Sequence, residues 1–97
     1  MRIYRDRDLT KRIETLDFGI LPAGETKTYS FWLYNETDAH IKELEIKIDH
    51  DELSIIESPD ELLPNASGEL KIKWRPSITL KEGLKANLCI RGIELWG

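Results

Sequence analysis

The sequence is poor in the residues that crosslinks and membrane insertion require. Cys89 is the only cysteine among 97 residues, so an internal disulfide is excluded, and a small fold without disulfides is typical of a reducing compartment. The longest apolar runs fall far short of the roughly 20 residues that span a bilayer, and the amino-terminal residues contain no apolar signal segment. We therefore expect cytoplasmic synthesis and no membrane partner.

Motifs of catalysis and cofactor binding are also missing. The sequence has no glycine-rich phosphate loop and no nucleophile motif, and its only histidines are His40 and His50. Asp49, Asp51 and Glu52 offer oxygen ligands beside His50, but without the spacing of a known metal-binding loop. We interpret this stretch as a solvated turn between strands. The sequence predicts a protein that is not an enzyme and binds no cofactor or metal, with a site at His40, His50 and Asp51 as the alternative.

Positive charge is concentrated in the first twelve residues. Five basic residues stand there against two acidic ones, which is a local charge of +3. Because the whole chain carries −4, the remainder carries −7. An acidic body disfavours nucleic acid as a partner, since affinity for a phosphate backbone comes mainly from clustered Lys and Arg.

Apolar and polar residues alternate with a period of two along most of the chain. This alternation, broken by turn-forming residues, predicts strands at residues 12–18, 26–34, 41–48, 53–57, 68–75, 84–91 and 93–96. Six or seven short strands in fewer than 100 residues indicate two packed sheets. We expect an all-β fold, an immunoglobulin-like two-sheet antiparallel sandwich of about seven strands at residues 13–97, preceded by an extended arm at residues 1–12.

The stretch from His40 to Ile56 is ambiguous. Its alternation shifts register between Ile41 and Leu44, which predicts a β-bulge near the start of the strand. A helix is the alternative, because Ile41, Leu44 and Ile48 also follow helical spacing. Ile46 would lie off that helical stripe, and β-branched residues favour strands, so we expect strands here.

Three segments resemble one family of domains. "LDFGILPAGETKTYSFWLYNETDA", "ELLPNASGELKIKWRPS" and "GLKANLCI" are similar to motifs of the immunoglobulin-like domains of the major sperm protein and the ASPM–SPD-2–Hydin group, over about residues 13–92. The resemblance implies that Phe18-Gly19 ends the first strand, that Gly24 lies in a turn and that Asn35 bonds nearby backbone. It also implies that Pro76 follows the fifth strand. Members usually act as binding or scaffolding modules, often in tandem within long proteins.

The first twelve residues and several aromatic residues depart from that resemblance. If Tyr29, Phe31 and Leu33 face inward, the pleat places Trp32 and Tyr34 on the outer face of the same sheet. Either a partner covers them, or another part of the same chain does. The arm likewise either docks on another subunit or adds an edge strand to its own domain.

Tyr, Trp and Arg are the residue types that anchor protein interfaces. The predicted partner-binding residues are Arg2, Tyr4, Arg5, Arg7, Trp32, Tyr34 and Trp96.

These features predict a structural or interaction protein. By analogy with small sandwiches that attach to large assemblies through a terminal arm, we expect a virion accessory subunit, such as a capsid decoration or head-associated protein. The alternative is a cytoplasmic adaptor that binds a peptide or filament, as the family resemblance implies. The expected partner is a protein or a larger capsid or scaffold assembly, and self-association into a homo-oligomer is an open alternative.

Overall fold

The computed structural model describes residues 1–96, and its regular structure consists of strands alone. Nine strands occur in the described residues: β1 (Arg2–Tyr4), β2 (Arg12–Ile13), β3 (Leu16–Gly19), β4 (Lys27–Tyr34), β5 (His40–Ile48), β6 (Leu53–Glu57), β7 (Ser67–Trp74), β8 (Leu84–Ala86) and β9 (Leu88–Leu95). The prediction of an all-β fold is confirmed, and the helical alternative for residues 40–56 is wrong because β5 and β6 occupy that stretch. Gly97, the last residue of the predicted domain, lies outside the described residues.

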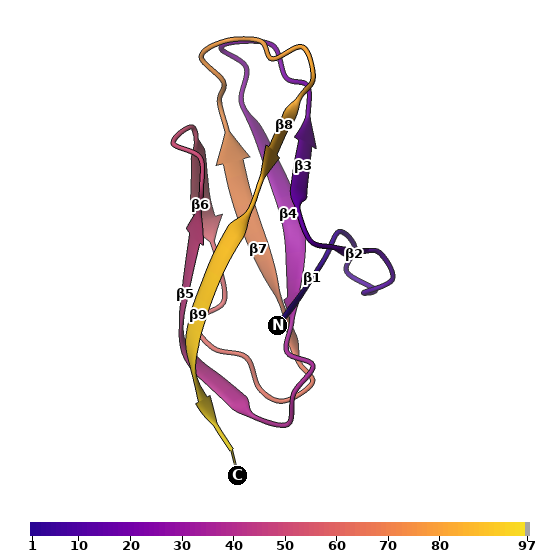
Figure 1. Ribbon diagram of the computed structural model, residues 1–97, viewed down its shortest axis with the longest axis vertical. Coiled ribbons are helices and arrows are strands. Elements are labelled where there is room, and N and C mark those ends of the chain that lie inside the picture. Colours follow the sequence, from indigo (N-terminus) through magenta and orange to yellow (C-terminus); the bar gives the residue numbers. More distant parts are fainter. Residues whose placement is uncertain (97) are drawn as a thin grey trace.

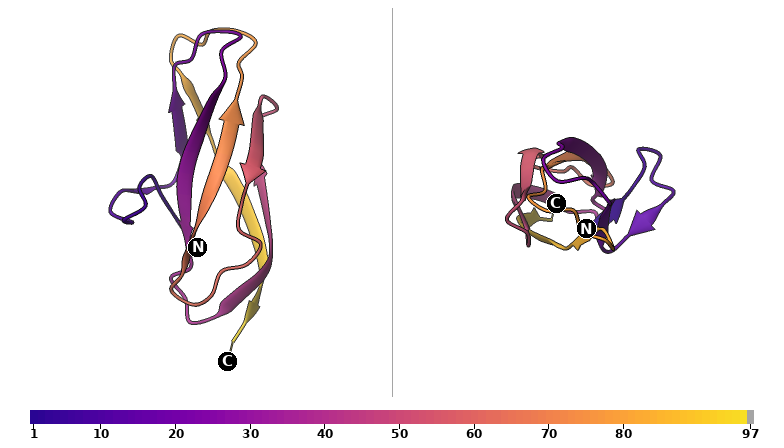
Figure 2. Two further views of the ribbon diagram at one scale, coloured as in Figure 1. Left: turned by 180° about the vertical axis from the view of Figure 1, so that it is seen from behind. Right: turned by 90° about the horizontal axis from the view of Figure 1, so that it is seen from above.

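The strands form two layers, as predicted for a sandwich (Figure 1). The first layer is a five-stranded antiparallel sheet in the order β2-β1-β4-β7-β6, which we call the large sheet. The second layer contains the antiparallel pairs β3-β8 and β5-β9. Because only Asn87 separates β8 from β9, these two strands form one long path through that layer. Figure 2 shows the layers from behind and from above.

The space between the layers holds the hydrophobic core. On β7, Leu70, Ile72 and Trp74 are completely buried, as the alternation of that strand predicts. Phe18 from the second layer packs edge to face against Phe31 and Trp74 of the large sheet. Each fully buried side chain of this size contributes about 2 kcal/mol to folding. The core cluster consists of Leu16, Phe18, Leu21, Phe31, Leu33, Leu53, Leu62, Leu70, Ile72, Trp74, Leu84 and Ala86.

The chain has more strands than the predicted seven, for two reasons. The arm forms β1, and the predicted strand at residues 12–18 is divided between the layers, with β2 in the large sheet and β3 in the second layer. The last two predicted strands have a different boundary. The break lies at Asn87, and β9 runs through Gly92 without interruption.

The division of residues 12–18 between two layers follows from the way side chains alternate between the two faces of a strand. Leu16 and Phe18 face the core from β3, so a straight continuation of that strand would also turn Glu14 and Arg12 inward. Burying two charges without partners is costly. The chain instead crosses to the large sheet, where Ile13 pairs with Ile3 and both pack against the core while Arg12 and Glu14 stay exposed.

The predicted bulge in β5 is confirmed. The register between β5 and β9 shifts between Lys42 and Glu45, and Glu43 has a positive φ of 51°. Gly92 lies opposite the bulge, and a Cβ there would come within 2.6 Å of the Ile41 Cγ2 atom. A side chain at position 92 would therefore force Ile41 or the bulge to shift.

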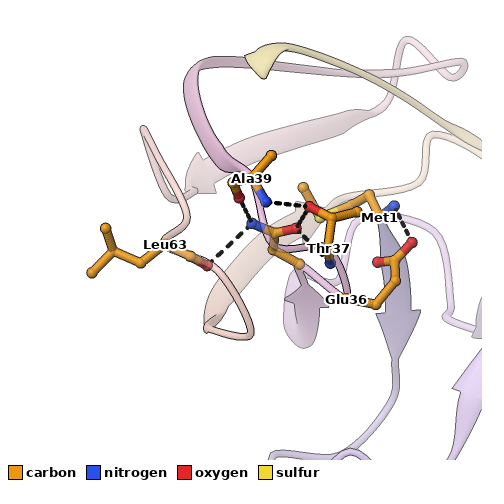
Figure 3. Close-up of polar contacts among 6 residues, drawn as sticks. Met1, Glu36, Thr37, Ala39 and Leu63 are labelled. Carbon is orange, nitrogen blue, oxygen red and sulfur yellow. Dashed lines mark hydrogen bonds and ion pairs between the residues drawn. The ribbon is translucent and has the colours of Figure 1, made fainter. Parts of the chain in front are cut away.

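Asn35, at the end of β4, is completely buried and joins the β4–β5 connection to residues 62–63; Figure 3 labels its partners Thr37, Ala39 and Leu63. Its Nδ2 donates hydrogen bonds to the carbonyl oxygens of Ala39, Leu62 and Leu63 at 2.7, 3.2 and 3.1 Å. Its Oδ1 accepts from the Thr37 backbone N–H and hydroxyl at 3.1 and 2.6 Å. The backbone-bonding role that the family resemblance implies for Asn35 is thus present.

Candidate interaction surface

Predicted binding residues meet on the outer face of the large sheet. β1 pairs antiparallel with β4 so that Tyr4 lies opposite Trp32 and Arg2 lies opposite Tyr34. Directly opposite residues share one face of a sheet, so the four side chains project away from the core. The rings of Tyr4 and Tyr34 meet edge to face at 6.2 Å.

The arm covers part of this cluster. Tyr4 is only 8% exposed, whereas Trp32 and Tyr34 are half-buried. Of the two arrangements that the sequence left open for the arm, the structure has the one in which residues 2–4 form a strand of the same domain. Ile3 lies opposite Leu33 and packs against the core, which fixes the inward side of β1. The arm is therefore an integral part of the sheet.

The turn between β1 and β2 is held by one carboxylate. Asp6 accepts hydrogen bonds from the Thr10 hydroxyl and from the backbone N–H groups of Lys11 and Thr10, and these bonds, the hydroxyl first, lower the pKa of the Asp6 carboxyl below its ordinary value. The Arg5 N–H also donates to the Lys11 carbonyl at 2.9 Å. Asp6 is consequently engaged within the turn, while Arg5 and Arg7 project into solvent.

The arginines around the aromatic cluster make no direct ion pairs in the described residues, although Arg2 acts on the Glu36 carboxylate and Glu69 lines the same hollow as Arg7. Within residues 1–96, none of Arg2, Arg5 and Arg7 forms an ion pair. Glu36 is engaged with the amino terminus, since the Met1 ammonium lies 2.8 Å from its Oε1 (Figure 3). Partial burial acts to raise the pKa of the Glu36 carboxyl, but the hydrogen bond and charge of that ammonium, with Arg2 nearby, hold this pKa below its usual value.

A shallow hollow lies beside the cluster. It has a volume of about 360 Å³ and is lined by Arg7, Trp32, Ser67, Gly68 and Glu69. The last three belong to β7, whose residue Glu69 lies opposite Trp32 on the outer face. Sequence reasoning missed this contribution, because the alternation of β7 indicates which residues face outward but not their register against β4.

Two predicted residues lie apart from the cluster. Arg5 lines a separate hollow of about 350 Å³ between β3 and β4, together with Asp17 and Lys27. Trp96 follows β9 in the second layer and is 66% exposed. The structure therefore brings together Arg2, Tyr4, Arg7, Trp32 and Tyr34, which we call the aromatic–arginine face.

The histidines are engaged in separate local contacts. His40 Nε2 lies 3.4 Å from Glu61 Oε2, and His50 Nδ1 accepts a hydrogen bond from the Glu52 backbone N–H at 3.2 Å. The Glu52 carboxylate in turn accepts from the Ser77 N–H. In the part of the chain that the structure describes, no cluster of three or more His, Cys, Asp or Glu side chains is arranged to hold a metal ion. Residues 1–96 also contain no helix capable of spanning a membrane.

Comparisons with known proteins found no relative. The chain matches no protein-family model, no curated protein and no solved structure.

Proposed function

We propose that this chain is a non-catalytic interaction module that docks on another protein through the aromatic–arginine face. One observation carries the proposal: exposed arginines without ion-pair partners in residues 1–96 surround half-buried aromatic rings on one sheet face. Arg forks bind carboxylates through paired hydrogen bonds, and Trp and Tyr supply rigid apolar contact area. The surface therefore suits a protein partner that presents acidic side chains around an apolar patch.

The setting of this docking follows from analogy. We propose a virion accessory subunit that attaches to an assembled capsid or head, with a cytoplasmic adaptor that binds a single peptide or filament as the second candidate. The adaptor is favoured by the resemblance of residues 13–92 to the major sperm protein and ASPM–SPD-2–Hydin domains, whose members serve as binding modules. In both settings the chain binds its partner through the same face. In both, the arm is paired with β4 of its own domain.

Charge reversal on the face tests the docking. We expect the double variant Arg2→Glu, Arg7→Glu to lose its partner in affinity purification from cells that express the protein, because it places like charges against an acidic surface. Lys42→Glu, Lys47→Glu is the matched control, since it makes the same charge change on exposed residues of β5 in the other layer. Equal recovery of the partner by both variants would sink the proposal.

The size of the partner then separates the two settings. A virion accessory subunit should sediment with intact particles and dissociate when they are taken apart, because its site is formed by the assembled lattice. An adaptor should bind one purified component in solution. Isothermal titration of the chain with the single purified partner protein should give a binding curve for an adaptor. For a virion subunit the same titration should give a flat trace, because the binding site exists only on the assembled particle.

A further inference from the structure

The second layer contains an unpaired strand edge. β9 pairs with β5 along one side from Leu88 to Leu95, and within residues 1–96 no strand pairs with its other side. In Figure 1, β5 follows one side of β9, while the opposite side of its lower half is open. The pairing of β3 with β8 ends where Leu16 lies opposite Ala86. Next to this pair, the Thr15 hydroxyl donates to Asn87 Oδ1 at 3.2 Å, and beyond it β3 and β9 do not pair.

Two contacts establish which backbone groups face the open side. Ile41 exchanges both of its backbone hydrogen bonds with Leu62, away from β9, at 2.9 and 2.8 Å. In an antiparallel ladder the residue opposite such a position also points its groups outward, and that residue is Glu94. At the other end, the Asn87 carbonyl accepts from Asp49 on the β5 side. Even-numbered residues therefore direct their N–H and C=O groups to the open side: Leu88, Ile90, Gly92 and Glu94.

The neighbouring strand edge is covered, in contrast to that of β9. The outer edge of β5 is bonded by residues 60–62, through Leu44 N–H to the Asp60 carbonyl and through the Ile41–Leu62 bridge. No segment among residues 1–96 covers β9 in this way, and the end of this strand carries the exposed side chains of Ile93 and Leu95, 49% and 46% accessible. A long apolar edge with free backbone groups is a site for pairing with another strand.

The chain cannot cover this edge with its own arm. A straight continuation of the β3-β8 register would place Glu14 opposite Leu88 and Arg12 opposite Ile90, with both charges turned toward the core. The same register would set Lys11 against Arg91. Because β1 and β2 are also paired within the large sheet, the cover has to come from a segment outside this domain.

We propose that the edge pairs with β9 of a second copy of this chain. Identical antiparallel strands pair across a two-fold axis, and such a dimer uses one self-complementary surface and leaves neither copy with an open β9 edge. A register centred on Gly92 sets no like charges opposite each other, whereas centring on Arg91 sets Arg91 against its own copy. In the Gly92 register, Ile90 lies opposite Glu94 of the second copy, and Cys89 lies opposite its Leu95. The result is a continuous four-stranded layer, β5-β9-β9-β5.

A proline substitution tests the edge without disturbing the domain. The Glu94 N–H points away from β5, so Glu94→Pro removes only donors toward the second copy, one from each chain. We expect light scattering to show the unmodified chain as a dimer, and Glu94→Pro to weaken dimerisation roughly tenfold or more. Glu94→Ala keeps the N–H and is the control, expected to dimerise as the unmodified chain does.

The outcomes of this experiment are separable. A chain that stays monomeric up to about 1 mM overturns the proposal, since its association would then be negligible. A dimer that Glu94→Pro leaves unchanged also overturns it, because that dimer uses another surface. Circular dichroism must show that Glu94→Pro retains its β-structure. If it does not, the deciding variant is Ile93→Lys, Leu95→Lys. It places a positive charge opposite Arg91 of the second copy and should weaken dimerisation by charge repulsion.

A disulfide tests the register. Cys89 and Leu95 both lie on the exposed face of β9, and directly opposite residues that do not exchange hydrogen bonds have Cα atoms close enough for a disulfide. We expect Leu95→Cys to form a covalent dimer on mild oxidation, with peptide mapping showing a 89–95 link between copies. Leu95→Cys with Cys89→Ser should lose this link. An Arg91→Cys, Cys89→Ser chain that crosslinks through position 91 instead would overturn the Gly92 register.

This inference is independent of the proposed function. The β9 edge lies in the second layer, and the aromatic–arginine face lies on the outer side of the large sheet. Arg2→Glu, Arg7→Glu should therefore leave dimerisation unchanged, and Glu94→Pro should leave each copy able to dock.

Discussion

Asn35 is the residue on which the connection between the two layers depends. It is completely buried, and its side chain donates to the carbonyl groups of Ala39, Leu62 and Leu63, of which the contacts with Ala39 and Leu62 are themselves buried. Through Leu62 it also supports the segment that covers the outer edge of β5. A single amide thus orders the path from β4 to β5 and the cover of that strand.

We expect Asn35→Ala to lower the free energy of unfolding by roughly 1 to 3 kcal/mol, because the buried Ala39 carbonyl is left without a partner, whereas the Leu62 carbonyl still accepts from the Ile41 N–H. Chemical denaturation followed by circular dichroism measures this loss. Thr37→Ala is a useful companion, since it removes only the hydroxyl that donates to Asn35 Oδ1 and should cost less. A loss below that of Thr37→Ala would show that the carbonyl groups find other partners.

At the scale of the element, β5 contains a local strain that substitution can relieve. Glu43 and Glu45 are both exposed glutamates of this strand, but only Glu43 has a positive φ, 51°. A residue with a Cβ atom pays roughly 1 to 2 kcal/mol in that conformation, and glycine does not.

We therefore expect opposite signs for two matched substitutions. Glu43→Gly should leave stability unchanged or raise it by up to about 1 kcal/mol, whereas Glu45→Gly should lower it by roughly 0.5 to 1 kcal/mol, because glycine in a regular strand adds only entropy to the unfolded chain. Thermal unfolding of both variants gives the comparison. Equal destabilisation by both substitutions would mean that the positive φ at position 43 stores no strain that glycine relieves.

The elements that sequence reasoning placed well are those with one buried and one solvated face. β6 has the predicted bounds, and β7 differs from its prediction by one residue at each end, since Leu70, Ile72 and Trp74 alternate with charged residues. The bulge in β5 was also predictable, because an extra residue changes the parity of the apolar positions. β1 was not, because its position depends on a register against β4 that local pattern does not contain.

The candidate site was predictable in composition but not in arrangement. Residue type alone indicated Tyr4, Trp32, Tyr34 and the arginines as interface candidates. Their assembly into one face required the pairing of β1 with β4, which is a contact between residues about thirty positions apart. The open edge of β9 is a property of topology, so it could not be recognised until the partners of every strand were known.

At the scale of the whole molecule, the arm contributes to stability as well as to the surface. β1 lies between β2 and β4, Tyr4 is nearly buried and Ile3 packs against the core. Deleting residues 1–11 would remove β1, the strand that pairs with both β4 and β2. It would expose the side chains of Trp32 and Tyr34 on β4 and the inward-facing side chain of Ile13 on β2. For this reason the docking proposal is tested by charge reversal in the full chain, since deletion would change the fold and the surface together.

We expect the chain lacking residues 1–11 to remain all-β by circular dichroism but to lose on the order of 4 kcal/mol of stability, because the deletion removes both Tyr4 and Ile3 and burying one large side chain contributes about 2 kcal/mol. The remaining sheet β4-β7-β6 and the whole second layer keep their partners, so unfolding should stay cooperative. In a Trp96→Phe background, the fluorescence of the half-buried Trp32 should shift to longer wavelength as water replaces Tyr4, while that of the buried Trp74 should not. Tyr4→Ala is the control that removes the cover but keeps the β1 backbone, and it should give the same shift with a smaller loss of stability. A deletion variant as stable as the full chain would contradict the arm's place in the sheet.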